Sequence, residues 1–304
     1  MKLLTLANPG LLRRICSKAV MPILFICMNE ALASNESEKF KSYWYSGEAE
    51  ITSYKLKQAR YGELREGSAV LVYVTEPFLA DKQVKADYDR PDNVSVLKLN
   101  TTKKFLTGLY PYSIMASTFH PVANKQHAIK VSTSTQEWCG NSFSQLNNRE
   151  LFDIASYSYF EQDYDRQIKL EKTHLENELW TKLRIDPGSL PEGDFKIIPS
   201  LEYLRLRHRK IQAYDATASF SENNGIRTYT LRYRDIERQL EIYYEPAFPY
   251  QILGWEETYI SGFGKEAKTM TSSAKKINTI KSDYWKKHGN KDLPLRKELG
   301  LPIN

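Results

Sequence analysis

The chain has few cysteines and histidines, which limits the chemistry that it can carry. It holds three cysteines and five histidines in 304 residues. Cys16 and Cys27 lie in an N-terminal segment that we expect to be removed, so only Cys139 would be left and an internal disulfide is excluded. There is no HExxH or His-x-His pattern and no EF-hand loop. The sequence therefore predicts no metal and no cofactor.

A strong net charge and long hydrophobic runs are lacking as well. The net charge is +6. Loss of residues 1–33 would remove four of 43 basic and one of 37 acidic residues, leaving 39 against 36 and a charge of +3. This balance predicts no nucleic-acid partner. No glycine-rich phosphate loop, serine nucleophile elbow or nucleotide motif occurs either.

The N-terminus has the pattern of a secretory signal peptide. A basic start precedes an apolar run over residues 19–28, and Ala-Leu-Ala ends at Ala33. The run is half as long as the roughly 20 residues that a spanning helix needs. We expect cleavage before Ser34, which predicts a periplasmic or envelope protein without a transmembrane span. A retained anchor and a lipoprotein at Cys27 are the weaker alternatives.

The chain is rich in aromatic residues, which favour strands. It has 20 Tyr, 12 Phe and 5 Trp. Apolar and polar residues alternate over 129–135 and 229–233, and an Asn-Gly turn at Asn224 predicts a hairpin. We predict a mainly β fold, a curved antiparallel meander that forms a half-barrel or a barrel-like sheet.

The same kinds of sequence pattern predict one central helix and divide the chain into four regions. Thr173 and Glu176 have the spacing of a capping box, and leucines recur at 175, 179 and 183. Leucine and arginine alternate over 204–209, which predicts a strand. The predicted regions are a signal peptide over 1–33, a β-rich lobe over 34–185, an antiparallel meander over 186–264, and a polar tail with short helices over 265–304.

Two groups of residues could bind a ligand. Three arginines would share one strand face, which suits an anionic ligand, and aromatic residues around two turns suit a sugar or a lipid. A solvated arginine face and a simply packed turn are the alternatives. The candidate ligand-binding residues are Tyr110, Tyr112, Trp138, Arg205, Arg207 and Arg209.

Cys139 is the one candidate nucleophile. It would need a histidine base, and His120 and His127 precede it in the sequence. The alternative is a small buried thiol beside Trp138.

Several segments resemble an exported, Bacteroidetes-type family of envelope proteins often labelled "septum formation inhibitor Maf". They are residues 43–54, 58–62, 102–112, 136–140 and 295–301. The Ser-x-Ser-x-Arg motif of true Maf pyrophosphatases is absent, because Ser134 is followed by Thr135 and Gln136, so no Maf catalytic residue is transferred. The meander over 229–260 is also similar to the curved sheets of LolA/LolB-type lipoprotein carriers, which hold acyl chains on a concave face.

These observations favour an exported, non-enzymatic envelope protein. It would bind a hydrophobic or amphipathic ligand such as a lipid, or an envelope protein partner, on its curved sheet. A cysteine-dependent enzyme that uses Cys139 with His120 or His127 is one alternative. A purely structural envelope protein is the other.

Overall fold

The computed structural model describes residues 37–123 and 126–303. The predicted signal peptide, its cleavage site and Cys27 lie outside these residues. The chain divides into two compact units, Met1–Ser46 and Gly47–Asn304. In the first unit, residues 37–44 are helical. No helix among the described residues has the length and apolar character needed to cross a membrane.

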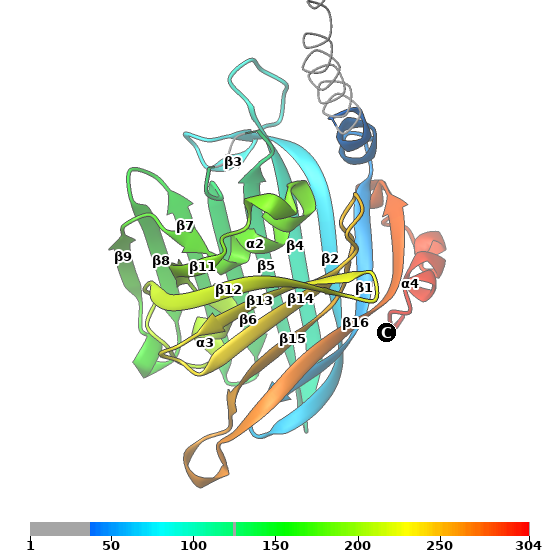
Figure 1. Cartoon of the computed structure of the whole chain (residues 1–304). Coiled ribbons are helices and arrows are strands. Elements are labelled where there is room, and N and C mark those ends of the chain that lie inside the picture. The colour runs from blue at the N-terminus through cyan, green and yellow to red at the C-terminus, as the bar shows by residue number, and fades with distance from the viewer. Residues whose placement is uncertain (1–36, 124–125, 304) are drawn as a thin grey trace, which may run out of the picture. The chain divides into compact units, whose positions relative to one another are not determined.

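The second unit is built on one large open sheet, so the predicted mainly β fold is confirmed (Figure 1). The described residues form 16 strands in this sheet. Their bounds are β1 Ala49–Arg60, β2 Glu63–Leu79, β3 Val84–Lys85, β4 Val94–Thr107, β5 Tyr110–Pro121, β6 Lys130–Glu137, β7 Gly140–Asn148, β8 Phe152–Ser158, β9 Arg166–Leu170, β10 His174–Leu175, β11 Gly193–Ile198, β12 Tyr214–Asn223, β13 Ile226–Tyr233, β14 Arg238–Tyr244, β15 Ile252–Ser261 and β16 Lys268–Ser282.

The first strand of the chain, β1, lies in the middle of the sheet. From β1 the chain runs outward through successive antiparallel neighbours to β9 at one edge. It resumes with β10 at the opposite edge and returns strand by strand to β16, which pairs with β1 at Ile51↔Ile280. Among the strands of the described residues, only β10 and β11 pair in parallel. The sheet stays open because β9 and β10 do not pair with each other.

Two helices pack on one face of this sheet. The predicted central helix is α2, Glu176–Ile185, and Figure 1 shows it in front of β4 and β5. Leu179 and Leu183 of α2 are fully buried against the sheet. Glu178, and not Glu176, reaches back to cap the helix, since its carboxylate accepts from the Leu175 N–H at 3.3 Å.

The second helix corrects one prediction. Leu201–Leu206 form α3, where the leucine–arginine alternation had predicted a strand. The Ser200 hydroxyl accepts from the Tyr203 N–H at 3.2 Å and starts the helix. The three arginines of this segment therefore do not share one strand face.

The predicted lobe over 34–185 and the predicted meander over 186–264 both contribute strands to this sheet. Gly47–Asn304 is one unit, so the proposed boundaries after residues 185 and 264 fall inside a single sheet. Much of the tail over 265–304 is not helical, because Lys268–Ser282 is strand β16. The helices that follow are short, ending with α4 at Pro294–Glu298. Just after α4, Leu299 packs on Ala49 and Ile51 on the other face of the sheet.

Candidate functional site

The interior between the sheet and its helices is filled. The cavity there has a volume of about 40 Å³ and is lined by Trp180, Trp255, Lys103 and Arg238, among others. A space of this size holds one water or very few. An acyl chain therefore does not fit on the helix-bearing face as the described residues are arranged.

Buried ion pairs surround this cavity and attach the helices to the sheet. Arg238 Nη2 donates to Glu176 Oε1 of α2 at 2.7 Å, and Arg238 Nε donates to Glu257 Oε1 of β15 at 2.7 Å. Lys103 Nζ of β4 donates to Glu202 Oε1 of α3 at 2.8 Å. Burial alone would raise the pKa of Glu176, but the charge and hydrogen bonds of Arg238, together with hydrogen bonds from Tyr233 and the Ser200 backbone, lower that pKa overall. We assign these groups a structural role.

A different surface gathers most of the predicted ligand-binding residues. Antiparallel hairpins place alternate turns at the same end of a sheet. The pairs Gly67↔Phe105, Ser113↔Gln136 and Ser142↔Ser158 bring neighbouring strand ends together there. We call this end the rim. Its turns are residues 61–62, 108–109, 138–139, 159–165 and 262–267.

Large apolar side chains project from the rim into solvent. The exposed fractions are 81% for Leu109, 67% for Trp138, 78% for Tyr159 and 56% for Phe263. Each belongs to the tip of a different hairpin or loop, and Figure 1 shows one of these tips, the β15–β16 turn, at the lower end. Single exposed apolar residues need no explanation, but four on neighbouring turns form a surface that a partner could cover.

The aromatic side chains of the rim contact one another across the turns. The rings of Tyr110 and Trp138 stack with centroids 6.3 Å apart. The rings of Tyr61 and Phe263 lie 6.2 Å apart. Tyr112, which we predicted to contact a ligand, is buried beneath this surface. Its hydroxyl oxygen lies 2.7 Å from the hydroxyl oxygen of Tyr61, which belongs to the rim.

Arginines lie directly behind these aromatic rings. Arg60 donates to the Tyr112 hydroxyl at 3.0 Å and to the Leu206 carbonyl at 2.7 Å. The guanidinium of Arg205 stacks on Phe160 at 4.2 Å, and its Nη1 lies 3.6 Å from a carboxylate oxygen of Asp163. These two arginines hold the turns in place.

Arg207 and Arg209 are different because no carboxylate pairs with them among the described residues. Arg207 is half-buried, and its guanidinium lies 5.8 Å from the ring centroid of Phe263. Burial lowers its pKa, and Tyr203 and Tyr259 only partly offset this effect of the loss of water. Arg209 is exposed at the end of α3. An anion at the rim would supply the missing counter-charge.

The structure brings Tyr110, Trp138 and the arginines after α3 to one end of the sheet. Sequence reasoning missed several members of the rim, among them Arg60, Phe160 and Phe263. Arg60 directly precedes a turn, and Phe160 and Phe263 lie within turns, which was the available signal, but their proximity depends on a strand register that no local pattern reveals.

Cys139 and its two candidate bases lie far apart. Cys139 is exposed at the β6–β7 turn, while His120 is buried at the other end of β5, ten residues from Tyr110 and hence about 30 Å along the strand. His127 Nδ1 lies 2.9 Å from Glu178 Oε1, also away from the rim. Glu137 raises the pKa of the Cys139 thiol, which opposes thiolate formation. This geometry offers no activated nucleophile.

Comparison with known proteins identifies no relative. No protein-family model, no curated protein and no solved structure matches the chain.

Proposed function

We propose that this chain is a non-enzymatic envelope protein whose rim binds the headgroup region of an anionic lipid bilayer. The observation that carries the proposal is the pairing of exposed apolar turns with Arg207 and Arg209, which have no carboxylate partner in the described residues. Aromatic rings favour the interface between headgroups and acyl chains, and a guanidinium forms paired hydrogen bonds with phosphate.

The filled interior supports contact at the rim in preference to uptake of a lipid. The cavity of about 40 Å³ is too small for an acyl chain, whereas the rim needs no space inside the sheet. The predicted signal peptide supports the same location, because export would bring the chain to a membrane surface.

Vesicle sedimentation tests the proposal. We expect the purified chain to sediment with phosphatidylglycerol vesicles and to stay in solution with phosphatidylcholine vesicles. Trp138→Ala and Phe263→Ser should each weaken the binding by about tenfold, because each removes more than 1 kcal/mol of apolar burial. Arg207→Gln should weaken binding to the anionic vesicles in particular.

Trp285→Ala is the matched control. Trp285 is 46% exposed, but it follows β16, whose last residue pairs with Ala49 at the end of the sheet opposite the rim. This variant should bind as the unaltered chain does. The proposal fails if the chain does not sediment with anionic vesicles, or if Trp285→Ala reduces the binding as much as Trp138→Ala does.

A further inference from the structure

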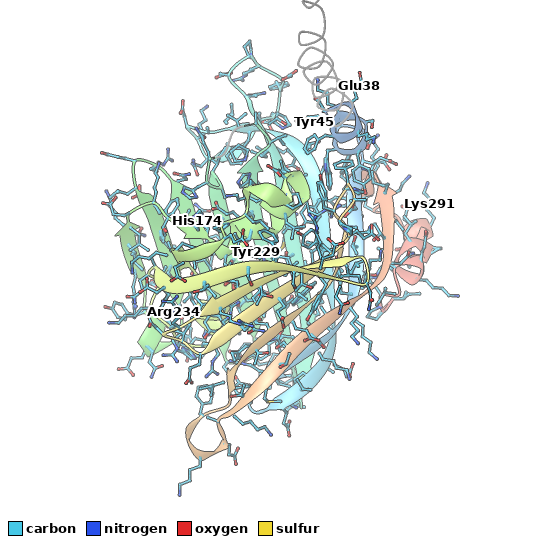
Figure 2. All side chains as sticks on the ribbon, in the orientation of Figure 1. Glu38, Tyr45, His174, Tyr229, Arg234 and Lys291 are labelled. Carbon is cyan, nitrogen blue, oxygen red and sulfur yellow. The ribbon has the colours of Figure 1, made fainter. Side chains whose placement is uncertain are left out.

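Three side chains that can bind a metal ion converge at the end of the sheet opposite the rim. His127 belongs to the segment between β5 and β6, His174 to β10 (Figure 2) and Glu178 to α2. One nitrogen or oxygen atom of each lies within 4.8 Å of the corresponding atoms of the other two. No short sequence motif joins these residues, so the fold alone assembles them.

The carboxylate of Glu178 is held in a fixed position. It is fully buried, and it accepts hydrogen bonds from the Ala128 N–H at 2.7 Å and the Leu175 N–H at 3.3 Å. His127 Nδ1 lies 2.9 Å from Glu178 Oε1. A ligand carboxylate that is oriented by backbone donors is typical of metal sites.

His174 contributes a nitrogen whose hydrogen-bonding capacity is unused. Its Nδ1 is buried and has no hydrogen-bond partner among the described residues. The ring meets Phe195 edge-on with centroids 5.2 Å apart, and it meets His127 in the same way at 5.9 Å. A buried polar atom without a partner is costly, and coordination of a cation would remove that cost.

The site borders a cleft on the side of His127. His127 lines a cleft with a volume of about 560 Å³, together with Gln83, Asn148 and Arg149. The cleft gives an ion a route from solvent and leaves room for water as a further ligand. Three protein ligands with one open position is the arrangement found in catalytic zinc sites.

We propose that His127, His174 and Glu178 bind a divalent transition-metal ion of the zinc class, with water from the cleft completing its coordination. Two imidazole nitrogens and one carboxylate oxygen suit such an ion. Bonds of about 2.1 Å in a tetrahedral site place ligand atoms about 3.4 Å apart, so the two partly exposed histidine rings must move inward by about 1 Å. If His127 Nδ1 is the ligand atom, its proton passes to solvent on binding.

Cobalt(II) is a suitable probe because it occupies zinc sites and absorbs visible light when bound there. We expect the chelator-treated full chain to give a saturable visible band with Co²⁺, and Zn²⁺ to abolish that band. His174→Ala should weaken Co²⁺ binding by at least about 100-fold, because substitutions outside the ligand set already cost about 10–100-fold. His127→Ala should do the same.

His288→Ala serves as the matched control, since His288 is exposed and lies outside the cluster. It should leave binding unchanged. Far-UV circular dichroism of each variant shows whether a loss of binding reflects a loss of fold. The proposal is overturned if the unaltered chain gives no saturable Co²⁺ or Zn²⁺ binding, or if a folded His174→Ala binds as tightly as His288→Ala.

Discussion

Replacing Arg238 by alanine should destabilise the fold more than any surface substitution. The guanidinium of Arg238 is almost fully buried and bridges Glu176 of α2 with Glu257 of β15. It also lies 4.2 Å from the ring centroid of Tyr203 in α3. Arg238→Ala would leave two buried carboxylates without this cation and would remove one of the contacts that connect the helices to the sheet.

The size of the effect follows from the burial of the pair. Removing one partner of a buried ion pair costs about 3–5 kcal/mol, because the remaining charge is neither solvated nor paired. In a domain of this size each kcal/mol lowers the melting temperature by about 2–4 °C. The free energy of unfolding should therefore fall enough to lower the melting temperature by about 6–20 °C.

Thermal unfolding followed by circular dichroism at pH 7 measures this shift. Arg232→Ala is the control, since Arg232 is exposed on the neighbouring strand and bonds only to Gln239, at 2.7 Å, among the described residues. We expect its melting temperature to stay within about 2 °C of the unaltered chain, as for most surface substitutions. Equal melting temperatures for Arg238→Ala and Arg232→Ala would refute the structural role of the ion cluster.

Three further predictions concern the same unit. The pKa of Glu176 is lowered in the folded chain from its usual value of 4.5. The stability that Glu176 contributes is therefore present above about pH 4.5 and is lost as the pH falls through the lower, folded-state pKa. Glu176→Gln should flatten the dependence of melting temperature on pH below about pH 4.5. Leu179→Ala should cost about 2–5 kcal/mol in urea unfolding, because the side chain is fully buried; a cost below about 1 kcal/mol would contradict the packing of α2. Gly254→Ala should cost about 1–3 kcal/mol in the same assay, since an added Cβ would lie 2.4 Å from the Ala274 carbonyl oxygen. An unchanged midpoint of urea unfolding would contradict this close approach of β15 and β16.

The repeating patterns of the sequence predicted the sheet and the central helix. Alternation in segments such as 229–233 marks a strand with one buried face, and the leucines of α2 mark a helix with one buried stripe. The segment over 204–209 was ambiguous, because Leu201 and Leu204 also have helical spacing and Ser200 is a good helix cap. Lys268–Ser282 has the polar composition of a solvated tail, and its pairing with β1 and β15 decided its conformation.

The two candidate sites differ in how much of each could be read from the sequence. Tyr110 and Trp138 stand beside recognisable turns, so their exposure at the rim followed from local patterns. Phe263 joins them only through the strand register. The cluster of His127, His174 and Glu178 was not predicted, because His127 is far from the others in sequence, and the four-residue spacing of His174 and Glu178 is common in helices without a metal.

The order of the strands sets when the sheet can form. Thr52 and Thr279 hydrogen-bond across β1 and β16 although they are 227 residues apart in the chain. During synthesis β1 emerges first among the strands and β16 last, so the middle of the sheet is its latest part to be completed. Closing so long a loop is slow, and until then one edge of β1 stays open to incorrect pairing. The sheet can therefore be completed only after β16 has been synthesised, and not when the first hairpins have formed.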